Sequence, residues 1–260
     1  MPLFSIITVT YQNLYGLRKT ASSISKQTHT DYEWIVIDGG SRDGTTDFLE
    51  KTQSKWISDP DDGIYDAMNK GISRATGDYL IFMNAGDCFA APDILSHIAK
   101  AIEHASEPPD FIYGDALEER LTLSLIRKPY YKAARSHKKW IYGMFTHHQA
   151  MLYSNDFISK NDLRYDDTYP IAADYKLTLQ CLRRTKKVLK IKDKAICLFE
   201  QGGVSQKHYS QGRGEQFKIR EELDVIPFWR NAMVYLLQTI AYQCRRFSPS
   251  LYWFIKGSRR

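Results

Sequence analysis

Short apolar runs alternate with helix-periodic segments through the first half of the chain, and this alternation constrains the fold more than any other feature. Apolar runs suited to buried strands cover residues 4–9, 34–37, 79–83 and 111–113. Between them, apolar residues recur at helical spacing over 14–24, 45–51, 64–75 and 94–105. Strands and helices that alternate in this way predict an α/β fold on a mainly parallel sheet.

Polar residues follow the predicted strands at their carboxyl ends, where Asn13, Asp38, Asp87 and Asp115 are found. Ligands of open parallel sheets bind beyond these ends, so we expect the binding site there. Three carboxylates at one edge repel one another unless a divalent cation or a row of backbone N–H groups lies between them. Turn formation is the alternative explanation for any single position, because Asp is common in turns.

The composition fits one large soluble domain, or one domain with an appendage. The chain has 260 residues, of which 43% are hydrophobic and 25% charged, which excludes disordered, collagen-like and coiled-coil classes. Residues 1–10 lack a basic leader, so we expect no signal peptide, and we expect no membrane span because no apolar run approaches about 20 residues. The cysteines are far apart and predict reduced thiols; they are Cys88, Cys181, Cys197 and Cys244.

Several common catalytic motifs are missing from the sequence. There is no GxxxxGK[ST], GxGxxG, GxSxG or HExxH segment, which argues against P-loop, dinucleotide-binding, α/β-hydrolase and zinc-protease functions. A nucleotidyltransferase would need a Gly-rich, basic loop directly after the first strand, and residues 11–14 do not supply one.

Four ordered segments resemble family 2 glycosyltransferases with the GT-A fold: SIITVTYQN at 5–13, EWIVIDGGSRDGT at 33–45, DGIYDAMNKGI at 62–72 and NAGD at 84–87. The resemblance is strongest to enzymes of capsule, O-antigen and colanic-acid assembly. It is strong over 3–90, looser to about 205 and weak beyond. It implies a Rossmann-like glycosyltransferase domain over 1–215, with a nucleotide-sugar half at about 1–115 and an acceptor half at about 116–215, followed by a basic, aromatic helical tail over 216–260.

The resemblance also implies a set of donor-binding residues. Asp38 would accept a hydrogen bond from the base, typically uracil, since a carboxylate only accepts. Gly39 and Gly40 would let the backbone approach closely. Lys70 would reach a phosphate, with a solvated helix lysine as the alternative. The implied nucleotide-sugar set is Thr10, Asn13, Asp38, Gly39, Gly40, Asp66, Asn69, Lys70, Asn84 and Ala85.

A divalent cation, Mg²⁺ or Mn²⁺, is the cofactor that the resemblance implies. Asp87 matches the last carboxylate of the family's DxD-type motif and would hold the ion that bridges the donor diphosphate. The sequence departs from the pattern here, because Asn84 and Gly86 stand where acidic residues are often found. Weaker metal binding, or a metal-independent variant, is therefore the alternative.

The implied catalytic base is Asp174, at the start of a predicted helix over 172–184. It would take the proton of an acceptor hydroxyl as that oxygen attacks the anomeric carbon opposite the leaving diphosphate, which inverts the configuration. The alternative is an Asp placed in the first helical turn by the helix dipole. Weaker expectations assign His148 and Gln149 to acceptor or diphosphate contacts, His208 to the metal, and the loop at 202–205 to closure over the donor.

The tail carries the whole charge excess of the protein. Residues 225–260 contain six basic and no acidic residues, and the formal net charge of the chain is +6. Aromatic residues lie between these cations, as in segments that face anionic lipid. We therefore expect a cytoplasmic protein that is peripheral on the inner face of the cell membrane. A helical hairpin packed on the domain is the alternative, and nucleic acid is not expected because no recognition motif is present.

These observations predict an inverting glycosyltransferase that moves a hexosyl or N-acetylhexosaminyl group from a nucleotide sugar, UDP-linked, to a saccharide acceptor. We expect the acceptor to be linked to a polyprenyl diphosphate and the pathway to be bacterial surface polysaccharide assembly. The alternative is a non-catalytic nucleotide-sugar-binding partner of an assembly complex, which the reduced acidic motif at 84–87 suggests and Asp174 opposes.

Overall fold

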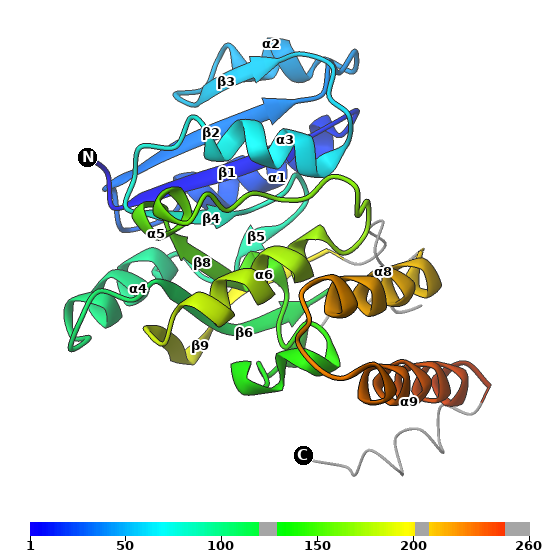
Figure 1. Ribbon diagram of the computed structural model, residues 1–260. Coiled ribbons are helices and arrows are strands. Elements are labelled where there is room, and N and C mark those ends of the chain that lie inside the picture. Colours follow the sequence, from blue (N-terminus) through cyan, green and yellow to red (C-terminus); the bar gives the residue numbers. More distant parts are fainter. Residues whose placement is uncertain (120–128, 201–207, 248–260) are drawn as a thin grey trace.

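A nine-stranded sheet forms the centre of the molecule, and the computed structural model describes residues 1–119, 129–200 and 208–247. The strand order is β3-β2-β1-β4-β8-β6-β9-β5, and β7 pairs with β6 (Figure 1). The strands are β1 (Phe4–Thr10), β2 (Tyr32–Asp38), β3 (Lys55–Ser58), β4 (Tyr79–Phe82), β5 (Cys88–Phe89), β6 (Phe111–Glu118), β7 (Tyr130–Lys132), β8 (Met151–Ser154) and β9 (Val188–Phe199).

The first four strands form the parallel part of the sheet. β1 pairs in parallel with both β2 and β4, and β2 pairs in parallel with β3. Their crossover helices are α1 (Leu14–Ser25), α2 (Thr45–Leu49) and α3 (Ile64–Ile72), close to the predicted ranges. Asn13 caps α1 by accepting a hydrogen bond from the Gly16 N–H at 3.0 Å, as its position in the sequence predicts. The register aligns Thr10 with Asp38, so the carboxyl ends of β1 and β2 lie together.

The second half of the sheet is mixed. β8 lies antiparallel between β4 and β6, whereas β6 and β9 are parallel. β5 pairs antiparallel with β9, and β7 pairs antiparallel with β6. The predicted α/β class with flanking helices is confirmed, and the parallel arrangement holds for β1 to β4. β3, β5, β7 and β8, which have two to four residues, were not predicted; β4 is as short but was predicted from its buried apolar run.

Asp115 does not lie where the sequence placed it. The strand predicted to end there continues to Glu118 as β6, with a register irregularity between Tyr113 and Asp115. The carboxylate accepts a hydrogen bond from the Ala134 N–H at 2.8 Å and another from the Tyr131 hydroxyl. Asp115 therefore anchors the segment beside β6 and does not belong to a row of carboxylates at strand ends.

Both faces of the sheet are buried, which explains the continuous apolar runs. Ile7, Ile35 and Phe82 belong to the core on one face, whereas Ile6 and Ile81 belong to the core on the other. The remaining covering helices are α4 (Ile94–Glu103), α5 (Asn155–Lys160) and α6 (Ala173–Arg184), and two 3₁₀ turns are η1 (His137–Tyr142) and η2 (His148–Ala150).

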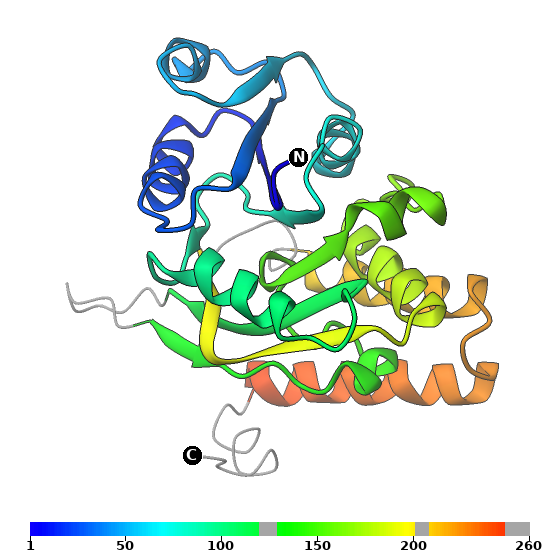
Figure 2. The ribbon, with the colours of Figure 1, turned by 90° about the vertical axis from the view of Figure 1, so that its left-hand side faces the viewer.

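Two helices close the described part of the chain, α8 (Tyr209–Glu222) and α9 (Phe228–Phe247), with a break at Pro227 as predicted. They pack on each other at the end of the molecule opposite β3 and α2, and α9 lies along the base of the lower half (Figure 2). The expected boundary at residue 215 falls within α8. Over the described ranges, no helix combines the length and apolarity required to traverse a bilayer.

Candidate donor and catalytic site

The turn at 84–87, directly after β4, is fixed by α1. The hydroxyl of Thr20 donates to the carbonyls of Asn84 at 3.1 Å and Asp87 at 2.7 Å, and it accepts from the Gly86 N–H at 3.0 Å. The Asn13 side-chain amide donates to the Ala85 carbonyl at 3.1 Å. Two side chains of α1 and its N-cap thus hold the backbone around Asp87, as a preorganised binding group requires. Gly86 adopts φ 110°, which favours glycine at this position.

Asp87 is a buried carboxylate with two hydrogen-bond donors. Gln149 donates through Nε2 to Oδ2 at 2.7 Å, and the Glu200 backbone N–H donates to Oδ1 at 3.1 Å. Burial raises the pKa of Asp87 to about 7, because these two hydrogen bonds only partly compensate for the lost hydration. A positive charge at this carboxylate would stabilise its ionised form. Gln149, predicted as an acceptor or diphosphate contact, instead contacts the predicted metal ligand.

A short chain of side chains links the 84–87 turn to the predicted base. The side-chain amide nitrogen of Asn84 lies 3.4 Å from Nε2 of His148, and Nδ1 of His148 lies 4.0 Å from Oδ2 of Asp174. Burial lowers the pKa of His148 to about 3, so its ring is neutral at physiological pH and this approach is no ion pair. The structure therefore brings Asn84, Asp87, His148, Gln149 and Asp174 into one site.

Asp174 lies in the first turn of α6 and is 18% exposed. Burial raises its pKa to about 6, opposed by the hydrogen bond from the Tyr175 N–H at 2.7 Å and by the nearby Tyr65 hydroxyl. A carboxylate with this pKa is ionised near neutral pH and is a better base than an ordinary aspartate. The Tyr65 hydroxyl also donates to the Ile171 carbonyl at 3.0 Å, which places α3 against the start of α6.

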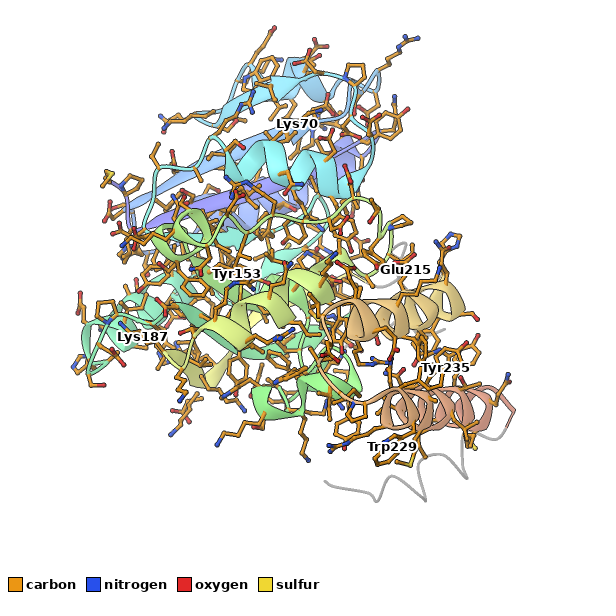
Figure 3. The ribbon with its side chains drawn as sticks, viewed as in Figure 1. Lys70, Tyr153, Lys187, Glu215, Trp229 and Tyr235 are labelled. Carbon is orange, nitrogen blue, oxygen red and sulfur yellow. The ribbon has the colours of Figure 1, made fainter. Side chains whose placement is uncertain are left out.

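Glu215 of α8 holds the segment just before Asp174. Its Oε2 accepts hydrogen bonds from the backbone N–H groups of Ile171 at 2.9 Å and Ala172 at 2.8 Å. These groups precede α6, and Figure 3 shows Glu215 between α8 and the nearby end of α6. Because two buried donors depend on one carboxylate, the position of Asp174 depends on α8.

The predicted base-binding residue, Asp38, is fully buried. Its Oδ2 accepts from the Ser41 N–H at 2.9 Å and the Ser58 hydroxyl at 2.6 Å, and its Oδ1 accepts from the Ser41 hydroxyl at 2.5 Å. Oδ1 keeps one further acceptor position, and Thr10, the strand-register partner of Asp38, has a buried hydroxyl without a hydrogen-bond partner among the described residues. A base would reach Asp38 only through a shift of the loop at 39–41 or of Ser58.

The two glycines of this loop have different reasons to be glycine. A side chain at Gly39 would collide with the Asp61 carboxylate and lie close to the ring of Tyr11, so only glycine fits there without a shift of a neighbour. Gly40 has φ 82°, a conformation that other residues rarely adopt. Tyr11 is exposed beside these glycines.

The predicted residues of α3 are engaged within the protein. Lys70 pairs with Asp66 at 2.8 Å and donates to the Pro60 carbonyl at 3.2 Å. Asn69 exchanges two hydrogen bonds with the backbone of Tyr165, donating at 2.8 Å and accepting at 2.9 Å. The structure therefore places these side chains around the 59–63 loop and the 165 segment.

One predicted residue and one predicted loop remain, and four further residues around the site were not predicted. His208 precedes α8 and is exposed, and the loop at 202–205 lies outside the described residues. Sequence reasoning missed Thr20, Tyr65, Glu200 and Glu215. Tyr65 stands in the third segment of the resemblance, so that segment was the available signal; the other three reveal their role only through long-range contacts.

The oxygen atoms around Asp87 are of the chemical type that binds a divalent cation. In the described ranges, no three His, Cys, Asp or Glu side chains are grouped to hold a metal ion by themselves. Asp87 nevertheless supplies a hard carboxylate, and the buried amide oxygens of Asn84 and Gln149 have no hydrogen-bond partner among the described groups. Oxygen ligands of this kind suit Mg²⁺ and Mn²⁺, which keep positions for diphosphate oxygens.

The fold and the site define an α/β protein with a ligand site at the carboxyl edge of its parallel strands. Residues 5–160 match the family model "Glycosyl transferase family 2", and the chain belongs to this family. An uncharacterized glycosyltransferase of Mycobacterium tuberculosis is 33% identical over 184 residues, which cover 69% of this chain and 68% of the relative. A PGL/p-HBAD biosynthesis glycosyltransferase of Mycobacterium bovis is 30% identical over 212 residues, or 78% of this chain and 79% of the relative.

Solved structures agree with this fold. S. aureus TarS 1–349 in complex with UDP-GlcNAc superimposes with a TM-score of 0.68 at 16% identity, over 94% of this chain and 73% of TarS. The mannosyltransferase PcManGT from Pyrobaculum calidifontis, in complex with GDP-Man and Mn²⁺, gives 0.64 at 12% identity, over 95% of this chain and 76% of that enzyme. At these identities the similarity confirms the GT-A fold alone.

Proposed function

We propose that this glycosyltransferase moves a sugar from a UDP-linked donor to a saccharide acceptor with inversion of the anomeric configuration. The observation that carries the proposal is the chain of contacts from Asn84 through His148 to Asp174. It places a candidate base beside the turn that holds Asp87. The two functions of the reaction, holding the leaving diphosphate and deprotonating the acceptor, thus meet in one site.

The donor lies across the carboxyl edge of β1, β2 and β4 in this proposal. Residues 1–115 bind the nucleoside, and residues 116–215 bind the acceptor. The uracil base would bind by Asp38 and Thr10, next to Gly39 and Gly40. Since TarS and PcManGT carry UDP- and GDP-sugars in their structures, a nucleotide sugar is the donor class that the fold favours. The proposed donor contacts are Thr10, Asn13, Asp38, Gly39, Gly40, Asp66, Asn69, Lys70, Asn84 and Ala85.

Asp174 would act as the general base. Its ionised carboxylate takes the proton from the acceptor hydroxyl while that oxygen forms a bond to the anomeric carbon. The bond between this carbon and the diphosphate oxygen breaks on the opposite face, and the electron pair leaves with the nucleoside diphosphate. Neutral His148, 4.0 Å from Asp174, is placed to orient the hydroxyl by a hydrogen bond without adding charge.

Asp87 would hold the divalent cation, Mg²⁺ or Mn²⁺. When bound, such an ion neutralises charge on the leaving diphosphate. Gln149 fixes the orientation of the Asp87 carboxylate through its 2.7 Å hydrogen bond, so it acts as a positioning residue for this ligand. His208, which is exposed just before α8, would supply a further ligand to this ion.

The acceptor that we propose is lipid-linked, in surface polysaccharide or glycolipid assembly, and α9 supports this. One face of α9 carries a stripe of exposed apolar side chains at helical spacing, which we call the α9 stripe: Trp229, Met233, Leu236, Leu237 and Ile240. Figure 3 shows Trp229 on the side of α9 away from α8 and Tyr235 on the side toward it. The relative in PGL/p-HBAD biosynthesis is consistent with a glycolipid product.

We propose that the α9 stripe rests on an anionic membrane surface. Residues 225–260 contain no acidic residue, and Arg230 is exposed on α9. The paired change Leu236→Asn with Leu237→Asn should abolish sedimentation with vesicles containing phosphatidylglycerol, because it removes two apolar anchors. The control change of exposed Gln53→Ala, at the opposite end of the molecule, should not. Equal sedimentation of both variants would exclude this surface.

Asp174→Asn tests the enzymatic role directly. The change keeps the shape of the side chain but removes the base, so UDP binding should persist while transfer to a lipid-linked acceptor is lost. Calorimetry with UDP and product analysis with radiolabelled UDP-sugars measure the two properties separately. If the wild-type protein binds UDP-sugar but transfers to no acceptor, the protein is a non-catalytic binding partner and the proposal fails.

A further inference from the structure

We propose that Glu200 supplies the second carboxylate of the divalent-cation site and replaces in space the acidic residue that the 84–87 motif lacks. The inference rests on the proposed function, since it concerns the same donor site. It explains how a motif reduced to Asp87 still presents two carboxylates to a cation. The chemistry recognised is a divalent cation bound together with a nucleoside diphosphate.

The position of the Glu200 side chain carries the argument. A side chain built on Gly86 would collide with Oε2 of Glu200, so the volume that an acidic residue at position 86 would fill already holds a carboxylate oxygen. The same residue donates its backbone N–H to Oδ1 of Asp87 at 3.1 Å. Glu200 directly follows β9, and its placement over the turn is thus fixed by the sheet and by Asp87.

Buried oxygen atoms beside the two carboxylates point to a ligand. Gln149 is 2% exposed, and its amide faces Asp87 through the 2.7 Å hydrogen bond from Nε2. The Oε1 atom of the same amide has no partner among the described groups, and neither has Oδ1 of Asn84. An unpaired buried acceptor costs free energy unless a donor or a cation satisfies it. Two carboxylates with adjacent amide oxygens form an all-oxygen set of the type that Mg²⁺ and Mn²⁺ bind.

Lys19 offers the competing explanation for Glu200. Its ammonium group lies 3.0 Å from Glu119 but 3.8 Å from Glu200, so Glu119 is its nearer partner. The Glu200 side chain is 40% exposed and remains accessible to a ligand. If Glu200 served only to pair with Lys19, removing Lys19 would have the same effect as removing the Glu200 charge.

Electron paramagnetic resonance of free Mn²⁺ tests the inference without an activity assay. Mn²⁺ is titrated into the full chain in the presence of saturating UDP, for the wild type, Glu200→Gln, Glu119→Gln and Lys19→Met. We expect Glu200→Gln to raise the Kd of Mn²⁺ by about tenfold or more. Glu119→Gln removes a charge of the same sign beside Lys19 and should change the Kd little. Lys19→Met should leave it unchanged or lower it, because a repelling cation is lost.

The outcomes separate this inference from the proposed function. Any of three results would overturn the role of Glu200 while leaving donor binding intact. Glu200→Gln could have the wild-type Kd for Mn²⁺, Glu119→Gln could raise this Kd as much as Glu200→Gln does, or Lys19→Met could raise it as much. Glu200→Asp keeps the charge and, if both Glu200 variants retain the wild-type circular dichroism, should bind Mn²⁺ more tightly than Glu200→Gln. UDP calorimetry with and without Mn²⁺ gives the independent check, since no UDP binding by the wild type under either condition would contradict the proposed function itself.

Discussion

The two edges of the parallel strands hold buried carboxylates in opposite electrostatic states. At the amino ends, Glu33 is almost completely buried, and its pKa is lowered to about 2. At the carboxyl edge, burial raises the pKa of Asp87 to about 7, and beside it that of Asp174 to about 6. The same sheet thus stabilises one charge and destabilises the others.

The number of donors explains the difference. Burial opposes ionisation of Glu33, but hydrogen bonds from Lys55, Ser5 and Thr76 outweigh it. The Ser5 hydroxyl donates at 2.5 Å, the Thr76 N–H at 2.6 Å and the Lys55 ammonium at 2.7 Å. Glu33 therefore ties the amino ends of β1, β2 and the segment before β4 together, as a structural charge does.

Two carboxylates at the other edge, Asp87 and Asp174, have fewer donors than their burial requires. Asp87 has two donors, and Asp174 keeps a raised pKa despite its contacts with Tyr175 and Tyr65. Such sites cost stability in the free protein and are typical of functional groups. Glu33 at the amino edge is therefore a structural charge, whereas Asp87 and Asp174 lack the donors that would fully stabilise their ionised forms.

The largest expected effect is the loss of transfer in Asp174→Asn. We expect kcat to fall by about 10²–10⁴-fold, the usual contribution of a general base. In the wild type, kcat/KM should decrease as the pH falls below about 6, because the base is then protonated. Steady-state kinetics in about half-unit steps from about pH 4.5 to about pH 8 measure the fall in kcat and the pH dependence of kcat/KM.

The same variant should also be more stable than the wild type at pH 7. A folded-state pKa above the ordinary value means that the ionised Asp174 costs stability once the pH exceeds that of the unfolded group, and Asn removes this cost of about 1–3 kcal/mol. Urea unfolding measures the difference. A variant less stable than the wild type at pH 7 would contradict the electrostatic contrast between the two edges.

Glu33→Gln should destabilise the protein by about 2–3 kcal/mol at pH 7. Because the pKa of Glu33 is lowered on folding, its contribution is complete above about pH 4.5 and is lost as the pH falls toward 2. Urea unfolding of the wild type and variant between pH 7 and pH 3 (about one-unit steps) should show the difference shrinking with acidity. UDP binding by the folded variant should not change, and a selective loss of UDP binding would contradict the assignment of Glu33 to a purely structural role.

A smaller effect is expected for Glu215→Gln. The amide oxygen still accepts from the Ile171 and Ala172 N–H groups, but more weakly than a carboxylate, so Asp174 is held less firmly. We expect kcat to fall about tenfold, with unchanged UDP affinity. Glu222→Gln is the matched control on α8, since it faces Lys176 instead of the 171–172 backbone. Equal losses in both variants would argue against a positioning role for Glu215.

Local pattern was sufficient for the parallel half of the fold. Buried apolar runs such as 34–37 and the Asn13 cap are signals contained within a few residues. The strands and helices that they mark were therefore predicted closely. β8 and the continuation of β6 past Asp115 escaped, because antiparallel insertion and a register irregularity depend on partners far along the chain. Local signals carry no information about such pairings.

The site shows the same division. Resemblance and strand ends pointed to Asp87 and Asp174, and the structure places Asp174 4.0 Å from His148 and Asp87 2.7 Å from the neighbouring Gln149. Their environments could not be predicted, because Gln149 and Glu200 reach Asp87 across 62 and 113 positions of sequence. Burial and donor number, which decide whether a carboxylate is structural or functional, emerge only when distant segments meet.

Calorimetric titration of UDP, with and without Mn²⁺, tests the central claim that the carboxyl edge binds a nucleotide-sugar donor. GDP serves as the competing nucleotide, and Asp87→Ala as the variant. We predict selective UDP binding that Mn²⁺ strengthens in the wild type, and loss of the Mn²⁺ effect in Asp87→Ala. UDP binding that is absent under every condition, or unchanged in Asp87→Ala with Mn²⁺, would contradict this account of the site.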